Sequence, residues 1–307
     1  MNRPILPDGV TVFERGWLSA NNILLCDAQT RVLVDSGYKT HADQTCALVA
    51  RTLGDRPLDL LVNTHLHSDH CGGNARLQRH WPRLHTWIPP GQAEAVAAWD
   101  EDRLSYRPTG QLCEPFRIDA LLPPGSSHRW GGLLWEVHAA PGHDPHSVIL
   151  FAPAARLLIS ADALWQQGFG VVFPELDDIA GFGDVAATLD LIERLAPQTV
   201  IPGHGAVFCE VAAALATARR KLEGFARMPA KHLRHGAKVL LKFKLLELGS
   251  VPHDAFVRWA HDVPFLQRMH RRHGQGLQLS DWVEALLAEL EQGGAIIRAQ
   301  GMLHDAP

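Results

Sequence analysis

A short, continuously apolar run at residues 58–63 leads directly into the segment THLHSDHCGG at residues 64–73. Three imidazoles and a carboxylate within six residues can reach a common point only from a loop, and the two glycines that follow let the chain turn tightly. A buried strand that ends in such a loop is typical of an α/β sheet, which binds its ligands at the carboxyl ends of its strands. Imidazole and carboxylate donors together favour a borderline divalent cation such as zinc.

Three later loops carry the same kinds of side chain, and each follows a predicted strand: His143 lies in APGH, Asp162 in SADA and His204 in IPGHG. Together with the first loop they give seven candidate metal ligands, which are His65, His67, Asp69, His70, His143, Asp162 and His204. Seven donors are too many for one tetrahedral ion. They suit two cations that share a carboxylate and a hydroxide.

The first two-thirds of the chain alternates short β-branched runs with helical patterns, which predicts an α/β domain with its helices outside the sheets. Strands are predicted at residues 10–13, 23–26, 32–35, 58–63, 84–88, 133–138, 148–151, 157–160 and 199–201. A helix is expected at 42–53, and Asp184 is expected to cap another helix that ends at Leu195.

The last quarter of the chain has a different pattern. A long Ala-rich helix at about 208–225 is followed by Pro229, and helices are predicted at about 230–248, 252–261 and 280–292. A short strand pair is expected at 295–298 and 302–304. Three helices and a terminal β-ribbon predict a small winged-helix-like domain. We therefore expect a boundary near residue 226, with domains at 1–226 and 227–307.

Composition excludes several classes of protein. The 307 residues are 46% hydrophobic and 20% charged, which is enough apolar material for a core, and the net charge of −4 disfavours a protein that coats nucleic acid. Five cysteines without a CxxC pair do not form a disulfide framework. The most apolar stretch, 148–165, contains Pro153, Arg156 and Asp162, which disfavours a membrane span. Because the N-terminus lacks a secretory pattern, we expect a cytoplasmic protein.

The order of these loops resembles the metallo-β-lactamase superfamily over residues 10–205. The resemblance implies a four-layer αββα sandwich, with the metals at one edge of its two sheets. It further implies that two divalent cations bind, zinc in the first place and iron or manganese as alternatives. The ligands that it implies are His65, His67 and His143 for the first metal, Asp69, His70 and His204 for the second, and Asp162 as a bridge between them.

The chemistry that such a site supports is hydrolysis. Two cations about 3.5–4 Å apart lower the pKa of a shared water and give a hydroxide near neutral pH. Asp69 is the candidate catalytic residue, because its carboxylate can orient that nucleophile or carry its proton. We therefore expect a dinuclear zinc hydrolase that cleaves a small ester-type substrate, with a thioester slightly favoured.

Two branches of the superfamily resemble the chain in different ways. The full ligand set resembles glyoxalase II, but PGHDPHS departs from the PGHTxGH motif common in that branch, and we carry over no glutathione-binding residues. The C-terminal extension is more similar to the winged-helix addition of the β-lactamase-like-2 group, which includes ribonucleases and thioesterases. The alternative functions are a phosphodiesterase or endoribonuclease, with RNA as substrate, and a mononuclear iron persulfide dioxygenase.

Charge patterning bears on the partners. The helix predicted at 230–248 carries four cations on one face, which are Lys231, Arg234, Lys238 and Lys242. This face is either an ordinary solvated surface or a rim that attracts an anionic acyl carrier, a coenzyme A ester or RNA. The acidic helix 280–292 disfavours duplex DNA. A small-molecule substrate, such as an anionic acyl thioester, is the expected partner. We expect Trp165, Phe169 and Phe173 either to line the substrate mouth or to be ordinary packing, and the remaining histidines to be solvated, among them His232, His235, His270 and His273.

Overall fold

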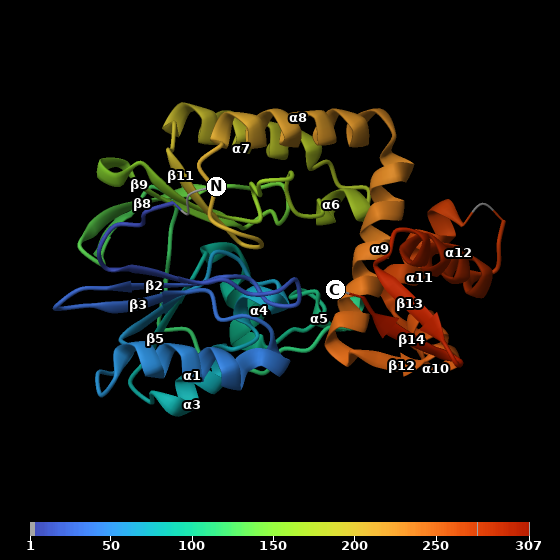
Figure 1. The fold of residues 1–307 in the computed structure, drawn as a ribbon, viewed down its shortest axis with the longest axis horizontal. Helices are drawn as coiled ribbons and strands as arrows, with labels where there is room; N and C mark the ends of the chain where they lie inside the picture. The colour runs from blue at the N-terminus through green and yellow to red at the C-terminus, as the bar shows by residue number, and fades with distance from the viewer. Residues whose placement is uncertain (1–3, 275, 307) are drawn as a thin grey trace.

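The structure is a computed structural model that describes residues 4–274 and 276–306. Two β-sheets face each other, and helices cover the outer face of each (Figure 1). The helices α7 and α8 lie on one outer face, and α1 and α3 lie on the opposite one. This arrangement confirms the predicted α/β class and the four αββα layers.

The first sheet has six strands in the order β1-β2-β3-β4-β5-β6. Their bounds are β1 Val10–Phe13, β2 Asn22–Cys26, β3 Arg31–Val34, β4 Leu60–Val62, β5 His85–Ile88 and β6 Ala120–Leu121. Strands β1 to β3 are antiparallel, and β3 to β6 are parallel. The outer face of this sheet is covered by α1 (Ala42–Leu53) and α3 (Asn74–His80).

The second sheet has five strands in the order β11-β10-β9-β8-β7. Their bounds are β7 Ser127–Trp130, β8 Leu133–Ala139, β9 Val148–Ala152, β10 Leu157–Ala161 and β11 Thr199–Pro202. Only the pair β10 and β11 is parallel. Its outer face is covered by α7 (Phe182–Leu195) and α8 (Val211–Arg227).

Both faces of the inner strands β2 to β4 and β9 to β11 are largely buried, which explains why these strands read as continuous apolar runs. In the first sheet Leu33 packs toward α1 and α3, whereas its neighbour Val34 packs toward the second sheet. In the second sheet Leu158 packs toward α7 and α8, and Ile159 packs toward the first sheet. Neighbouring residues therefore supply separate cores, as the two-residue period of a strand requires.

Several predicted boundaries were wrong. The strand predicted at 58–63 is only β4, Leu60–Val62. Asp184 is not an N-cap, because α7 begins at Phe182 and Gly181 precedes it; the carboxylate lies in the first turn, where the helix dipole still favours an acid. The shorter elements of the same region are η1 Lys39–His41, α2 Ser68–Cys71, η2 Pro90–Gln92, α4 Ala93–Ala98, α5 Tyr106–Thr109, η3 Pro153–Ala155 and α6 Phe173–Leu176.

The C-terminal region differs from its prediction in two respects. It has four helices in its described residues, where three were predicted: α9 Pro229–Leu248, α10 His253–Asp262, α11 Pro264–His273 and α12 Leu279–Gln292. The strand pair is part of a three-stranded sheet in the order β12-β14-β13, with bounds Ser250–Pro252, Met302–Asp305 and Ile296–Ala299. The region's likeness to a winged helix stays a prediction.

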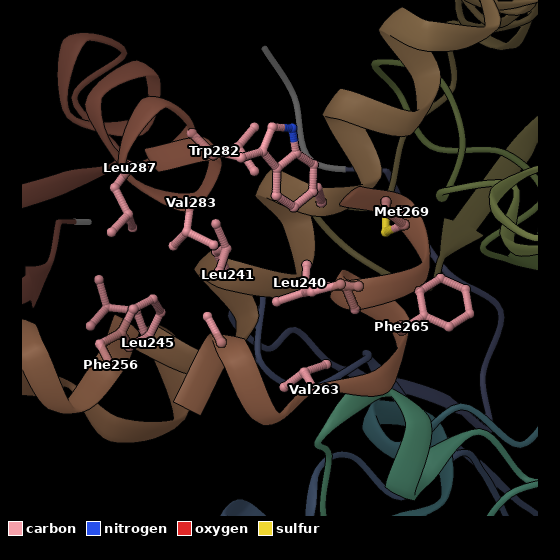
Figure 2. Close-up of a cluster of buried hydrophobic side chains, with 14 of the residues drawn as sticks. Leu240, Leu241, Leu245, Phe256, Val263, Phe265, Met269, Trp282, Val283 and Leu287 are labelled. Atoms are coloured by element: carbon pink, nitrogen blue, oxygen red, sulfur yellow. The ribbon is translucent and has the colours of Figure 1, made fainter. Parts of the chain in front are cut away.

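The helix α9 connects the sandwich to this C-terminal region (Figure 1). Pro229 is its first residue, where a fixed φ and a missing N–H cost nothing. Side chains from α9, α10, α11 and α12 form one apolar core, in which Leu241, Phe256 and Trp282 are fully buried (Figure 2). Leu176 of α6 belongs to the same core, so the C-terminal helices pack against the sandwich. The division at residue 226 stays a prediction.

No helix within residues 4–274 and 276–306 has both the length and the apolar character that a membrane crossing demands.

Candidate metal centre

The structure brings the donor atoms of all seven predicted ligands to one edge of the sandwich. The loops that carry them follow β4, β8, β10 and β11 at the carboxyl ends of these strands, and α2 carries Asp69 and His70. The donors form two groups, and within each group the atoms lie within 4.8 Å of one another. The groups are His65, His67 and His143, and Asp69, His70, Asp162 and His204.

The first group consists of three imidazoles. His67 Nδ1 lies 3.1 Å from His65 Nε2 and 2.8 Å from His143 Nε2. His143 donates its Nδ1–H to the carbonyl of Val171 at 2.6 Å, so the neutral ring turns the lone pair of Nε2 toward the group. Burial lowers the pKa of His65 well below its ordinary value and lowers the pKa of His143 to about 4. Imidazole rings whose nitrogen atoms converge in this way fit a shared cation.

In the second group, Asp35 selects the nitrogen that His70 presents. His70 donates its Nδ1–H to Asp35 Oδ2 at 2.7 Å. Its Nε2 is buried, has no hydrogen-bond partner among the described residues, and lies 3.4 Å from Asp162 Oδ1. The backbone N–H and the hydroxyl of Thr64 also donate to Asp35, at 2.9 and 2.8 Å. A buried nitrogen that is oriented but unpaired is what a metal-binding histidine provides.

Asp162 lies between the two groups. Its Oδ2 is 3.3 Å from His143 Nε2 in the first group, and its Oδ1 is 3.4 Å from His70 Nε2 in the second. Burial raises the pKa of Asp162, but the neighbouring imidazoles of His70, His204 and His143 outweigh burial and hold that pKa well below its ordinary value. A carboxylate with one oxygen toward each group fits a pair of cations, and the donor chemistry fits divalent ions.

Asp69 and His204 complete the second group. Their atoms Oδ2 and Nε2 are 3.0 Å apart. The indole ring of Trp17 stacks on His204, with ring centroids 5.4 Å apart and planes inclined by 12°. Asp69 lies in the wall of a cavity, where a substrate can reach its carboxylate.

Sequence reasoning missed three residues of the site. Asp35 was predicted only as the last residue of a strand, although an acid at the carboxyl end of a buried strand beside β4 is a usable signal. Asp144 is buried, with Oδ2 3.8 Å from His67 Nε2, and it directly follows a predicted ligand. Trp17 lies in a turn far from the histidine motif, and no local pattern indicates its role.

The donors open onto a cavity of about 620 Å³. Trp165, Phe169 and Phe173 all line it, together with Trp17. Helix α9 supplies a further wall, which consists of His235, Lys238, Val239, Leu240, Lys242, Phe243 and Leu246. The cavity is therefore mostly apolar, and the C-terminal region contributes to it directly.

The charges of α9 are largely compensated. Arg234 and Lys238 both pair with Glu289 of α12, and Lys242 pairs with Asp305. The prediction that His232 is solvated was wrong. Its side chain is buried and its Nε2 accepts the backbone N–H of Val172 at 3.1 Å, because α9 packs against the loop that follows β10.

The αββα fold and the two donor groups define a class of protein, the metallo-hydrolases. The sequence profile of the metallo-beta-lactamase superfamily matches residues 15–204, and the chain belongs to this superfamily.

Two curated relatives are similar to the chain. A hydroxyacylglutathione hydrolase of Synechococcus sp. is 28% identical over 158 residues, which make up 50% of this chain and 50% of that protein. The chain thus spans about half the length of that relative. An acyl-coenzyme A thioesterase, MBLAC2 of Gallus gallus, is 26% identical over 205 residues, which cover 62% of this chain and 73% of that protein.

Among solved structures, a metallo-beta-lactamase family protein of Thermus thermophilus is similar along nearly the whole chain. Its TM-score is 0.56 and its sequence identity 18%, and the match covers 97% of this chain and 98% of that one. At this identity the likeness shows the fold alone.

Proposed function

We propose that the protein is a dinuclear metal hydrolase, with zinc as the metal, that cleaves a small ester-type substrate. The observation that carries this proposal is that the two donor groups are joined by Asp162 in the wall of a mostly apolar cavity. In this proposal His65, His67 and His143 hold one ion. Asp69, His70 and His204 hold the other, and Asp162 contacts both.

Two divalent cations bound at these donors would lower the pKa of a water molecule and would polarise the carbonyl or phosphoryl oxygen of a substrate. The chain's own groups orient and receive protons. Asp69 is placed to accept the proton of an attacking water, because its carboxylate lines the cavity beside His204. Asp35 keeps His70 in the tautomer that leaves Nε2 free.

A thioester is the favoured substrate for two reasons. The cavity is lined by aromatic and aliphatic side chains, which suit an acyl chain. The named activities of the two relatives, a hydroxyacylglutathione hydrolase and an acyl-coenzyme A thioesterase, both concern thioesters. RNA is less favoured, because Glu289 and Asp305 pair with cations of α9 and reduce the positive charge that this helix offers to a phosphate backbone.

The test combines metal analysis with a panel of thioesters, lactones, phosphodiesters and RNA. We expect two zinc ions per chain and thioester hydrolysis that falls at least about 100-fold in Asp69→Ala, because the variant loses a metal ligand and a proton acceptor. Asp43→Ala on the exposed surface of α1 is the control and is expected to keep the activity. One iron and no zinc would support a persulfide dioxygenase instead, and cleavage of RNA alone would support a nuclease. Full activity of Asp69→Ala would contradict the mechanism.

We also propose that residues 1–226 form the hydrolase domain and that 227–307 form a second domain that closes its cavity. The support is that α9 and α12 contribute side chains to the cavity wall, whereas the seven donors all come from the first region.

A further inference from the structure

Lys221 of α8 lines the cavity and has an unusual environment. Its Nζ donates a hydrogen bond to the carbonyl of Phe169 at 2.9 Å. The same atom lies 5.0 Å from the ring centroid of Phe169, 5.7 Å from that of Phe225 and 6.0 Å from that of Trp165. Within residues 4–274 and 276–306, no carboxylate forms an ion pair with it.

The other basic groups of the cavity either pair with a carboxylate or are neutral. Lys238 is 2.9 Å from Glu289, which also pairs with Arg234, and Lys242 pairs with Asp305. Burial lowers the pKa of His235 to about 4, so its ring is neutral at pH 7. Burial also lowers the pKa of Lys221, to about 8, which still leaves most of its ammonium group charged at neutral pH. Away from the metal donors, Lys221 is therefore the charged group of the described cavity wall that has no carboxylate partner.

This charge lies next to the candidate metal centre. Trp165 connects the two, because its Nε1–H donates to Asp162 Oδ1 at 3.2 Å and its ring packs edge-on against His204, with centroids 5.4 Å apart. Lys221 lies beside the same indole ring. A molecule whose reacting bond is at the donors can therefore extend along Trp165 to the ammonium group.

We propose that Lys221 binds an anionic group of the substrate, a carboxylate or a phosphate, while the bond to be cleaved lies at the metal donors. The inference rests on the proposed hydrolase function and narrows its substrate to an anionic ester-type molecule. Of the three N–H groups of the ammonium, one is used by Phe169, and two are left for an incoming oxygen. The aromatic neighbours exclude water and strengthen that contact.

The test compares pairs of thioesters that differ by one anionic group. One pair, hexanoyl and adipoyl N-acetylcysteamine, varies a carboxylate on the acid side; the other, hexanoyl pantetheine and hexanoyl 4′-phosphopantetheine, varies a phosphate on the thiol side. We expect the wild type to prefer the anionic member of at least one pair in kcat/KM. In Lys221→Met, which keeps the apolar stem, that preference falls about 10- to 100-fold, the usual effect of a charged hydrogen bond. Lys221→Arg retains most of it.

Lys39→Met is the matched control, because Lys39 does not line the cavity and its charge is paired with Glu114. In this control, the ratio of kcat/KM for the anionic thioester to that for the neutral one should stay within about 2-fold of the wild-type ratio. The reason is that a charge paired with a carboxylate contributes little to the electrostatic field in the cavity. An equal preference in Lys221→Met and the wild type would overturn the proposal, and so would the absence of any preference in the wild type.

A binding measurement separates this proposal from the proposed function. If the wild type hydrolyses none of the thioesters, the hydrolase proposal fails, and titration calorimetry with octanoate, octyl phosphate and octanol still tests Lys221. We expect the affinity for at least one anion, relative to octanol, to fall about 10-fold or more in Lys221→Met. The same relative affinity in both proteins would refute the site, and the melting temperature of each variant shows that it is folded.

Discussion

At the scale of single residues, the site depends on groups that orient the donors. Asp35 accepts hydrogen bonds from His70 and twice from Thr64, and it is almost fully buried. Because these hydrogen bonds fix the carboxylate, the imidazole of His70 has one tautomer and one orientation. Metal ligands that are fixed in this way lose no rotational freedom when a metal binds. The loss of side-chain conformational entropy occurs when the protein folds.

His232 allows a prediction for pH. Burial lowers its pKa to about 3, compared with about 6.5 in an unfolded chain. The folded state therefore binds fewer protons, and its stabilisation is complete above pH 6.5 and is lost as the pH falls from 6.5 toward 3. We expect the free energy of unfolding of His232→Gln to depend less steeply on pH in this range, by up to about 1.4 kcal/mol per pH unit.

The measurement is urea unfolding of wild type and His232→Gln between pH 4 and 7.5. Glutamine keeps an acceptor for the N–H of Val172 but does not titrate. His273→Gln, on the partly exposed end of α11, is the control and should leave the pH dependence unchanged. Identical curves for wild type and His232→Gln would show that His232 is not buried as a neutral ring.

At the scale of elements, the close approach of two loops forms the site. Gly203 follows β11, and a Cβ at this position would overlap Asp162 Oδ1 and lie 3.0 Å from the carbonyl carbon of Ala161. We expect Gly203→Ala to displace Asp162 and to weaken metal binding at least about 10-fold, as changes beside metal ligands do. A chelator competition titration measures this.

Gly183→Ala is the control for this substitution. A Cβ at Gly183 meets no atom within 4 Å, and the residue lies in α7, where alanine is the better helix former. Its metal affinity should be that of the wild type. If Gly203→Ala also bound metal normally, the contact between the loops would not position Asp162.

The elements that sequence reasoning predicted are those with a strong apolar pattern. Helix 42–53 and strand 10–13 have the predicted bounds, because their apolar residues follow one period and turn residues delimit them. The strand β7, Ser127–Trp130, was missed because its first three residues are polar and lie at the edge of the sheet. The helix α11 was missed because its last turn is entirely basic and does not continue the apolar repeat of its first turns.

The candidate donors could be predicted from local motifs, but the cavity could not. Five donors lie in short loops next to glycine or a strand end, and Asp69 and His70 lie in the short helix α2 directly after one of these loops, so the pattern is visible in a few consecutive residues. The cavity wall combines Trp17, Lys221 and Phe243, which are far apart in the sequence and meet only through tertiary packing. The pairing of Lys238 with Glu289 likewise depends on how α9 and α12 pack.

At the scale of the whole molecule, the sandwich and the C-terminal region share an apolar core through Leu176. The side chain is fully buried, and Leu176→Ala is expected to cost about 2–5 kcal/mol. Because the core is shared, we expect the amide hydrogens of both β10 and α12 to exchange faster in this variant than in the wild type. Leu134→Ala, which is 40% exposed, should change stability by less than about 0.5 kcal/mol. Faster exchange in α12 alone would show that the two regions unfold independently.

The position of α9 has a consequence for how such enzymes diverge. Its cavity-facing side chains form no hydrogen bond with the seven donors in the described part of the chain, yet they shape the space that a ligand occupies. Mutations along one helical face can thus retune which molecules are accepted while the reaction machinery is inherited intact. The part of the cavity wall that α9 supplies is thus encoded in a stretch of the gene separate from the one that encodes the donors.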